Sequence, residues 1–247
     1  MRRHVKPVAY APGALTTGNL FLGFSSIVCS FNDQFLPAAW MIIIGGFLDL
    51  LDGKVARLSD NDSRFGAELD SMADMITFGL APIMLVYKPV LQNYGKIGLL
   101  IGFFYIMCGA FRLARFNIQP PKKEKSNFTG LPIPTAAGLI ASFILFTNEL
   151  FGEPGFVWPM LIIFLTITMG VMMISSIEYI CFPKFSWKTG KSRAKLILFL
   201  IYFCLLAIFP AYVFFPTAVM YLLSGLIAAP FSHFHHDLEE EMSEINV

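Results

Sequence analysis

Four aspartates with helical spacing lie in a polar segment between two apolar runs. Asp49 and Asp52 are three positions apart, and Asp70 and Asp74 are four apart. On helices, each spacing places both side chains of a pair on one face. Four carboxylates brought together repel one another, and two divalent cations would balance their charges. Hard oxygen ligands suit Mg²⁺ or Mn²⁺, so the pattern predicts a two-metal site for phosphoryl chemistry.

A plainer interpretation is that these carboxylates are surface charges at helix ends, paired with Lys54, Arg57 and Arg64. That interpretation suits any one of them better than all four at helical spacing. Gly53 and Gly66 favour a binding site, because a residue without a Cβ lets a ligand or backbone approach closely. Arg57, one turn after Gly53, could reach a phosphate from the rim of such a site.

The same segment resembles the CDP-alcohol phosphatidyltransferase family at every fixed position of that family's signature. The matching residues are Asp49, Asp52, Gly53, Ala56, Arg57, Gly66, Asp70 and Asp74. The resemblance implies a metal-dependent transfer of a phosphatidyl group from a CDP-activated lipid to a small alcohol, with CMP leaving. It implies that Asp49, Asp52 and Asp70 are metal ligands and that Asp74 is both ligand and general base. Gly53, Ala56, Arg57 and Gly66 would border the CMP portion.

Three further stretches bear on the acceptor alcohol. "TTGNLFLGF" (16–24), "FRLARFN" (111–117) and "FTGLPIPTAAG" (128–138) are similar to the membrane-embedded type of phosphatidylserine synthase, which implies CDP-diacylglycerol and L-serine as substrates. Arg112 and Arg115 could clamp a carboxylate or a phosphate; the alternative is that they anchor the helix end at the lipid headgroups. Asn117 could bind substrate or cap a helix. Thr17 and Asn19 could approach the nucleotide or serve helix contacts alone.

The elements that must position these residues are membrane helices. The chain has 247 residues, of which 56% are hydrophobic and 14% charged, and apolar runs long enough to cross a bilayer recur along it. We predict an all-α polytopic bundle, a six-helix catalytic core plus two further spans. The eight predicted spans are 13–31, 35–58, 64–88, 95–115, 130–150, 156–177, 194–210 and 211–231.

The distribution of basic residues predicts the orientation. Sixteen of the 18 Lys and Arg residues fall in segments on one side, and only Lys88 and Lys96 fall on the other. The positive-inside bias then places both termini and the aspartates in the cytoplasm, in a bacterial or archaeal membrane. The four cysteines form no ligand motif and are expected to be reduced. We predict one membrane domain over 1–231 and an acidic tail over 232–247.

Two other functions fit parts of the pattern. The same chemistry could use glycerol 3-phosphate or an inositol as acceptor, or an archaeal-type lipid donor. A divalent-cation transporter could use the carboxylates as an ion site, although both pairs lie at helix ends and no inverted repeat is visible. The family resemblance suggests a homodimer, and no nucleic-acid partner is predicted.

Overall fold

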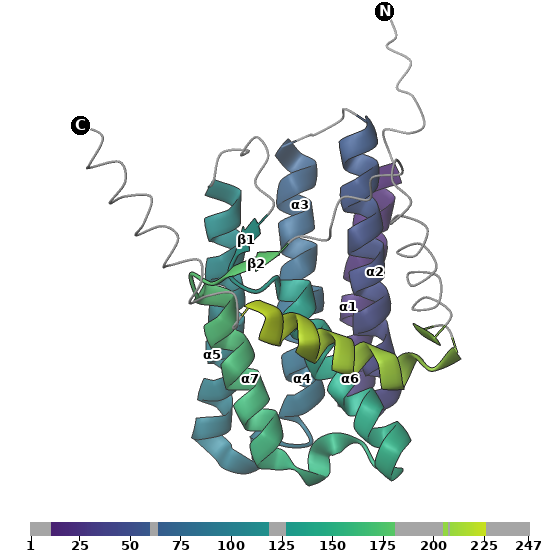
Figure 1. Cartoon of the computed structure of the whole chain (residues 1–247), viewed down its shortest axis with the longest axis vertical. Coiled ribbons are helices and arrows are strands. Elements are labelled where there is room, and N and C mark those ends of the chain that lie inside the picture. Colours follow the sequence, from purple (N-terminus) through teal and green to yellow (C-terminus); the bar gives the residue numbers. More distant parts are fainter. Residues whose placement is uncertain (1–10, 60–63, 119–126, 181–204, 207, 226–247) are drawn as a thin grey trace, which may run out of the picture.

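Apolar runs of the length that a bilayer requires become helices packed side by side (Figure 1). The computed structural model of the chain describes residues 11–59, 64–118, 127–180, 205–206 and 208–225. Its longer helices are α1 (Ala11–Phe31), α2 (Phe35–Ser59), α3 (Arg64–Asp74), α4 (Ala81–Tyr87), α5 (Gly95–Ile118), α6 (Ile133–Phe151), α7 (Pro159–Ile174) and an unlabelled helix, Pro210–Gly225. Shorter turns are the π-helix η2 (Met75–Leu80) and the 3-10 helices η3 (Leu91–Tyr94) and η4 (Gly155–Val157).

Five of these helical stretches are long and apolar enough to cross a membrane, so the chain is an integral membrane protein. They cover Gly13–Phe31, Phe35–Lys54, Phe65–Tyr87, Leu91–Ile118 and Ile133–Phe151. The first five predicted spans are thereby confirmed, with α3, η2 and α4 forming one continuous helical stretch.

The later predicted spans differ from the structure in length. The sixth, predicted over 156–177, is the 16-residue helix α7, which is shorter than the roughly 20 residues of a typical span. The seventh, 194–210, lies for the most part outside the described residues, which include only 205–206 and 208–210 of it. The eighth, 211–231, corresponds to the helix Pro210–Gly225, and its last residues are outside the description, as is the predicted tail 232–247.

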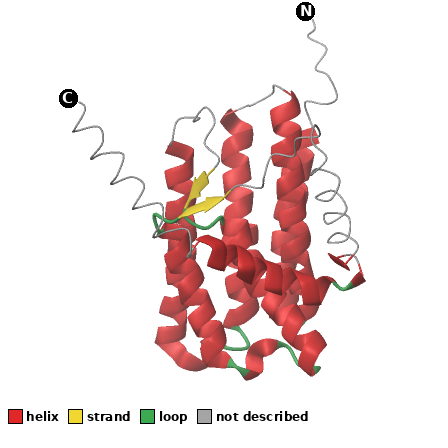
Figure 2. Cartoon of the chain, in the orientation of Figure 1, coloured by secondary structure: helices red, strands yellow, loops and turns green. Residues whose placement is uncertain are grey.

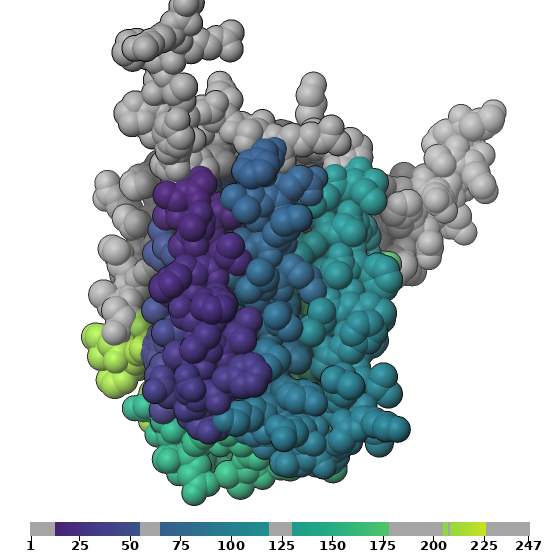
Figure 3. Space-filling view, turned by 180° about the vertical axis from the view of Figure 1, so that it is seen from behind, coloured from purple at the N-terminus to yellow at the C-terminus, as the bar shows by residue number. Residues whose placement is uncertain are grey.

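The bundle core lies where α6 packs against the α3–η2–α4 stretch. Phe78 of η2, Leu85 of α4, and Leu139 and Ile144 of α6 are all fully buried. Large apolar side chains such as Phe103 of α5 are exposed on the outside of the bundle. Seen from behind, α1, the 64–87 stretch and α5 lie side by side and form this face (Figure 3). Its exposed apolar surface is suited to acyl chains of the bilayer.

Two short strands interrupt the helical architecture near the upper end of α5 in Figure 2. Strand β1 (Asn127–Thr129) pairs antiparallel with β2 (Glu178–Ile180), with Phe128 opposite Tyr179. The all-α prediction is otherwise confirmed by the described residues. This pairing ties the segment before α6 to the segment after α7.

The helix Pro210–Gly225 crosses the bundle instead of running along it (Figure 1). Phe215 packs against α6, with its ring centroid 5.4 Å from that of Phe143 and 5.2 Å from that of Phe146. The Tyr212 hydroxyl donates a hydrogen bond to the Glu149 carbonyl oxygen at 3.3 Å. Aromatic contacts of this kind hold the helix to the outer face of α6.

Candidate active site

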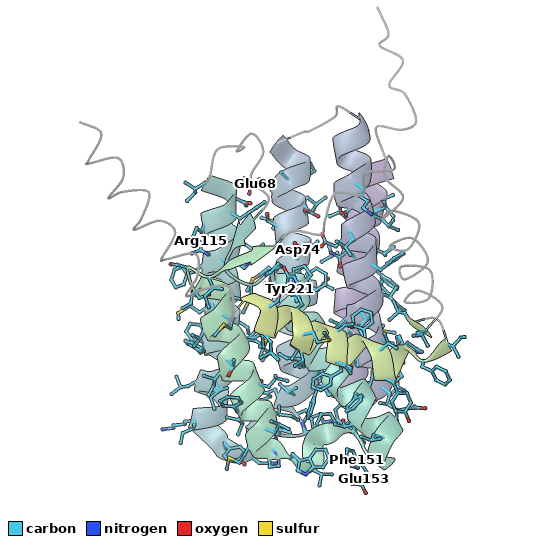
Figure 4. All side chains as sticks on the ribbon, in the orientation of Figure 1. Glu68, Asp74, Arg115, Phe151, Glu153 and Tyr221 are labelled. Atoms are coloured by element: carbon cyan, nitrogen blue, oxygen red, sulfur yellow. The ribbon has the colours of Figure 1, made fainter. Side chains whose placement is uncertain are left out.

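Three of the four predicted aspartates form a tight carboxylate group. Asp49 comes from the second half of α2, and Asp70 and Asp74 come from α3. One carboxylate oxygen from each of the three lies within 4.8 Å of the other two. The four-residue spacing on α3 aligns Asp70 with Asp74, and the antiparallel neighbour α2 adds Asp49. Asp74 and Arg115 lie toward the same end of the bundle, opposite Phe151 (Figure 4).

Asp52 lies beside this group. Its side chain is 4% exposed, and its Oδ2 accepts a hydrogen bond from Thr16 Oγ1 of α1 at 3.2 Å. It is within electrostatic range of Asp49 and Asp70. The structure therefore gathers all four carboxylates in one neighbourhood, with Asp49, Asp70 and Asp74 close enough to share a cation.

The group fits a hard divalent cation. Asp70 Oδ1 is buried and has no hydrogen-bond partner in the described structure, and an unsatisfied buried carboxylate oxygen is costly. A cation bound between the three side chains would satisfy it. Carboxylate oxygens are the ligands that Mg²⁺ and Mn²⁺ prefer. When bound, such ions could neutralise phosphate oxygens and stabilise a leaving phosphate.

Helix α1 contributes polar side chains to the carboxylates. Asn19 is fully buried, and its Nδ2 donates to Asp74 Oδ1 at 3.3 Å. Thr17, the other candidate from this helix, is exposed, and its hydroxyl donates to the Gly13 carbonyl oxygen at 2.6 Å. Thr16 instead faces the site. Sequence reasoning missed it, although its spacing of three from Asn19 places both residues on one helical face.

The remaining signature residues flank the aspartates along the chain. Gly53 is half-buried directly after Asp52, and Gly66 is half-buried one turn before Asp70. For Ala56 and Arg57 the structure describes the helix backbone alone. The two glycines therefore stand next to the aspartates along α2 and α3.

Arg112 of α5 is a cation near the aspartates. It is within electrostatic range of Asp74 and Asp49. Its Nε is buried and has no hydrogen-bond partner in the described structure. A guanidinium donor left open beside a carboxylate group is suited to an anionic ligand, because the fork of N–H groups can hold a carboxylate or phosphate.

Arg115, one turn further along α5, packs against a glycine turn. A Cβ atom on Gly130 would lie 2.8 Å from Arg115 Nη2 and 3.1 Å from the Ser175 carbonyl oxygen. Gly130 has φ +80°, a conformation that favours glycine. The Gly130 N–H donates to the Ile177 carbonyl oxygen at 2.8 Å. The stretch 128–138 thus joins α5, the start of α6 and the end of α7.

Asn117 links α5 to α3. Its Nδ2 donates to Ser71 Oγ at 3.0 Å, and Ser71 directly follows Asp70. The pair lies on the exposed edge of the site. Ser71 gave no signal in the sequence, because its partner is 46 positions away.

Comparisons with known proteins identify the family of this chain. The CDP-alcohol phosphatidyltransferase family model matches residues 9–177. This range includes all four aspartates of the site. A Helicobacter pylori protein (strain 26695) named CDP-diacylglycerol–serine O-phosphatidyltransferase is 36% identical over 90% of this chain and 92% of its own length.

Two other relatives are similar over shorter stretches. A Bacillus subtilis protein with the same name is 36% identical over 71% of this chain and 92% of its own length. An archaetidylserine synthase from Methanothermobacter thermautotrophicus is 37% identical over 68% of each chain. With the aspartates gathered on α2 and α3 inside the matched region, the chain belongs to the CDP-alcohol phosphatidyltransferase family.

Proposed function

We propose that the protein transfers a phosphatidyl group from CDP-diacylglycerol to the hydroxyl of L-serine, giving phosphatidylserine and CMP. The observation that carries this proposal is the carboxylate group with an open guanidinium beside it: Asp49, Asp70 and Asp74 within 4.8 Å, and Arg112 with an unpartnered buried Nε. The names of the relatives support serine as the acceptor. The membrane setting suits a reaction whose lipid stays in the bilayer while nucleotide and serine arrive from water.

The proposed cofactor is a pair of divalent cations, Mg²⁺ or Mn²⁺, held by Asp49, Asp52, Asp70 and Asp74. Bound there, they would neutralise the diphosphate of the donor and stabilise the departing CMP. Two ions match the four negative charges of the aspartates. The residues proposed to lie along the CMP portion of the donor are Gly53, Ala56, Arg57, Gly66 and Asn19. Thr17 is left out of this proposed donor-binding set because its side chain is exposed.

In the proposed reaction Asp74 accepts the proton of the serine hydroxyl. The freed oxygen attacks the phosphorus atom attached to the lipid, and the bond from that phosphorus to the CMP oxygen breaks. Asn19 Nδ2, which donates to Asp74 Oδ1, orients the carboxylate and leaves its other oxygen for the proton. Arg112 holds the serine carboxylate, so the hydroxyl is presented to Asp74.

The test of the function is CMP release by the purified protein from CDP-diacylglycerol with Mn²⁺ or Mg²⁺. Serine, glycerol 3-phosphate and inositol are offered in parallel, and serine with an archaeal-type ether lipid donor forms a further arm. We expect release with serine alone among the acceptors. Release with another acceptor would retain the aspartate mechanism and reject the acceptor assignment. No release in any arm, together with manganese uptake by proteoliposomes, would favour a transporter.

Arg112 and Arg115 are predicted to respond differently to substitution. Arg112→Gln should raise KM for serine roughly 10- to 100-fold, because a hydrogen bond to a charged group contributes about 1.5–3 kcal/mol. Arg115→Gln should mainly lower the melting temperature, since its guanidinium packs on the Gly130 turn. Steady-state kinetics at varied serine, with thermal melting of both variants, measures the two effects.

Arg112→Lys is the matched control for charge. It keeps the positive charge and loses the planar fork, so it should recover only part of the serine affinity. A KM for serine that is equal in wild type and Arg112→Gln would reject Arg112 as the acceptor-binding residue. A large rise in KM for Arg115→Gln would instead assign the acceptor to Arg115.

We also propose the topology inferred from the sequence: eight spans, six of them a catalytic core, with both termini and the aspartates on the cytoplasmic side. One domain over 1–231 and an acidic tail over 232–247 complete the proposed organisation, and a homodimer is proposed from the family resemblance. Membrane-impermeant labelling of single cysteines introduced at exposed end positions, such as Asp33 on the opposite side, tests the orientation in intact cells. Mass measurement in detergent tests the dimer.

A further inference from the structure

A π-helical turn follows directly after Asp74. The turn η2 covers Met75–Leu80, and Asp74 is the residue that precedes it. π-helical turns are rare and occur often at functional sites, where the extra residue in the turn changes the direction of the helix faces. Here Asp74 faces the carboxylate group, while Thr77 and Phe78, directly beyond it, are fully buried in the bundle.

Two hydrogen bonds from side chains hold this turn to different helices. Thr77 Oγ1 donates to the Asn19 carbonyl oxygen of α1 at 3.0 Å. The Tyr105 hydroxyl of α5 donates to the Phe78 carbonyl oxygen at 3.1 Å. Thr77 and Tyr105 are both 0% exposed. Buried hydrogen bonds of this kind fix a geometry that apolar packing alone would leave free.

The packing around Thr77 brings three helices close together. A Cβ atom on Gly23 of α1 would lie 2.8 Å from Thr77 Cα, and one on Gly45 of α2 would lie 2.8 Å from Thr77 Cγ2. Glycines at these positions therefore permit the approach. The first turn of η2 is seated between α1 and α2, the same helices that carry Asn19 and Asp49.

Asn19 joins the turn to the carboxylate. Its carbonyl oxygen accepts from Thr77, and its side-chain Nδ2 donates to Asp74 Oδ1 at 3.3 Å. One residue of α1 therefore contacts both the Asp74 carboxylate and a side chain of the π-helical turn that follows it. A shift of η2 relative to α1 would change the distance between Asn19 and Asp74.

We propose that Thr77 and Tyr105 are positioning residues, which fasten the π-helical turn to α1 and α5 and thereby orient the Asp74 carboxylate. This inference rests on the proposed role of Asp74 as ligand and base. It predicts that losing either hydroxyl impairs the carboxylate while the acceptor site stays intact. Partners that orient a ligand in this way typically change metal affinity or activity by roughly 10- to 100-fold when removed.

The test compares hydroxyl deletions at Thr77 and Tyr105 with deletions of hydroxyls that lie away from the turn. Thr77→Val removes the bond to Asn19, whereas Thr166→Val removes a bond of 2.8 Å within α7, to the Ile162 carbonyl oxygen, at a residue that is also 0% exposed. Thr77→Ser keeps the hydroxyl. For Tyr105→Phe the control is Tyr212→Phe, which also removes a bond to a backbone carbonyl oxygen of another helix, that of Glu149, at a residue that is 39% exposed.

Three measurements are made on the full-length protein: kcat and KM for serine from CMP release, Mn²⁺ binding by electron paramagnetic resonance with CDP-diacylglycerol and no acceptor, and the melting temperature. Thr77→Val and Tyr105→Phe should lower kcat and weaken Mn²⁺ binding by roughly 10- to 100-fold each, with KM for serine unchanged. Thr77→Ser should restore both, and the Thr166 and Tyr212 variants should match wild type.

Two results would overturn the inference. One is Thr77→Val and Tyr105→Phe matching their controls in kcat and Mn²⁺ binding. The other is a lowered melting temperature with wild-type kcat and Mn²⁺ binding in the folded fraction, which would make the hydroxyls purely structural. The Asp74→Asn variant separates a failure of this inference from a failure of the proposed function. If Asp74→Asn is inactive while the Thr77 and Tyr105 variants match their controls, only the positioning role is rejected. Normal activity of Asp74→Asn would reject the proposed function of Asp74 itself.

Discussion

Asp74→Asn is expected to abolish turnover while leaving donor binding largely intact. General-base catalysis contributes roughly 100- to 10,000-fold to a rate, and the same substitution removes one negative charge from the carboxylate group. We therefore expect CMP release to fall by more than about 1,000-fold. The amide is isosteric, and its oxygen can still accept the hydrogen bond that Asn19 Nδ2 donates, so the helix packing should persist. CMP release measures the loss of turnover, and equilibrium binding of CDP-diacylglycerol measures the retained donor binding.

Asp33→Asn is the matched control for this substitution. Asp33 pairs with Lys88 at 2.7 Å, and its side chain is 66% exposed. An exposed ion pair contributes at most about 1 kcal/mol, so this variant should release CMP as wild type does. Normal turnover by Asp74→Asn would reject the base assignment. Loss of donor binding together with turnover would assign Asp74 to metal or substrate binding alone.

The carboxylate group could be predicted because its geometry is local. A spacing of four on α3 places Asp70 and Asp74 on one face, whatever the rest of the fold does. Helices α2 and α3 follow each other closely in the sequence and meet at the site, which adds Asp49. Hydropathy alone gives the first five spans, because a bilayer requires long apolar helices.

The contacts that organise the site could not be predicted in the same way. Tyr105 meets the Phe78 carbonyl oxygen 27 positions earlier, and Thr77 meets Asn19 58 positions earlier. Such pairs depend on how whole helices are placed against one another. A π-helical turn also shifts the faces of its helix by a residue, so spacing counted across Met75–Leu80 misleads. The sequence also points to Thr17 and not to its neighbour Thr16, which bonds Asp52, because the direction in which a helix face points depends on the placement of the whole helix, and adjacent residues point about 100° apart.

The segments after α6 show the limits of hydropathy. A run of apolar residues predicts a helix but does not give its direction, and Pro210–Gly225 crosses the bundle. Aromatic contacts to Phe143 and Phe146 set that arrangement, and nothing in its composition distinguishes it from a span. The helix brings Tyr221 into electrostatic range of Arg112. The helix Pro210–Gly225 therefore lies nearer the site than its hydropathy pattern indicates.

Asp70→Asn is expected to weaken metal dependence as well as rate. Asp70 Oδ1 is the buried carboxylate oxygen that has no hydrogen-bond partner in the described structure, so a bound cation is its natural partner. An amide oxygen is a neutral and weaker ligand. The Mn²⁺ concentration for half-maximal CMP release should rise by roughly 100-fold or more, because losing a charged ligand should reduce metal affinity at least as much as losing a partner that orients a ligand, which typically costs about 10- to 100-fold. Chelation of divalent cations by EDTA should abolish wild-type release, and added Mn²⁺ should restore it.

Asp33→Asn again serves as the control, because its carboxylate lies at the opposite end of the bundle, away from the group formed by Asp49, Asp70 and Asp74. A metal titration of Asp70→Asn that superimposes on wild type would contradict the ligand role. A lower rate with an unchanged titration would place Asp70 in catalysis without the metal. High Mn²⁺ that restores the full rate of Asp70→Asn would show that the remaining carboxylates suffice once the site is filled, since the loss then lies in affinity alone.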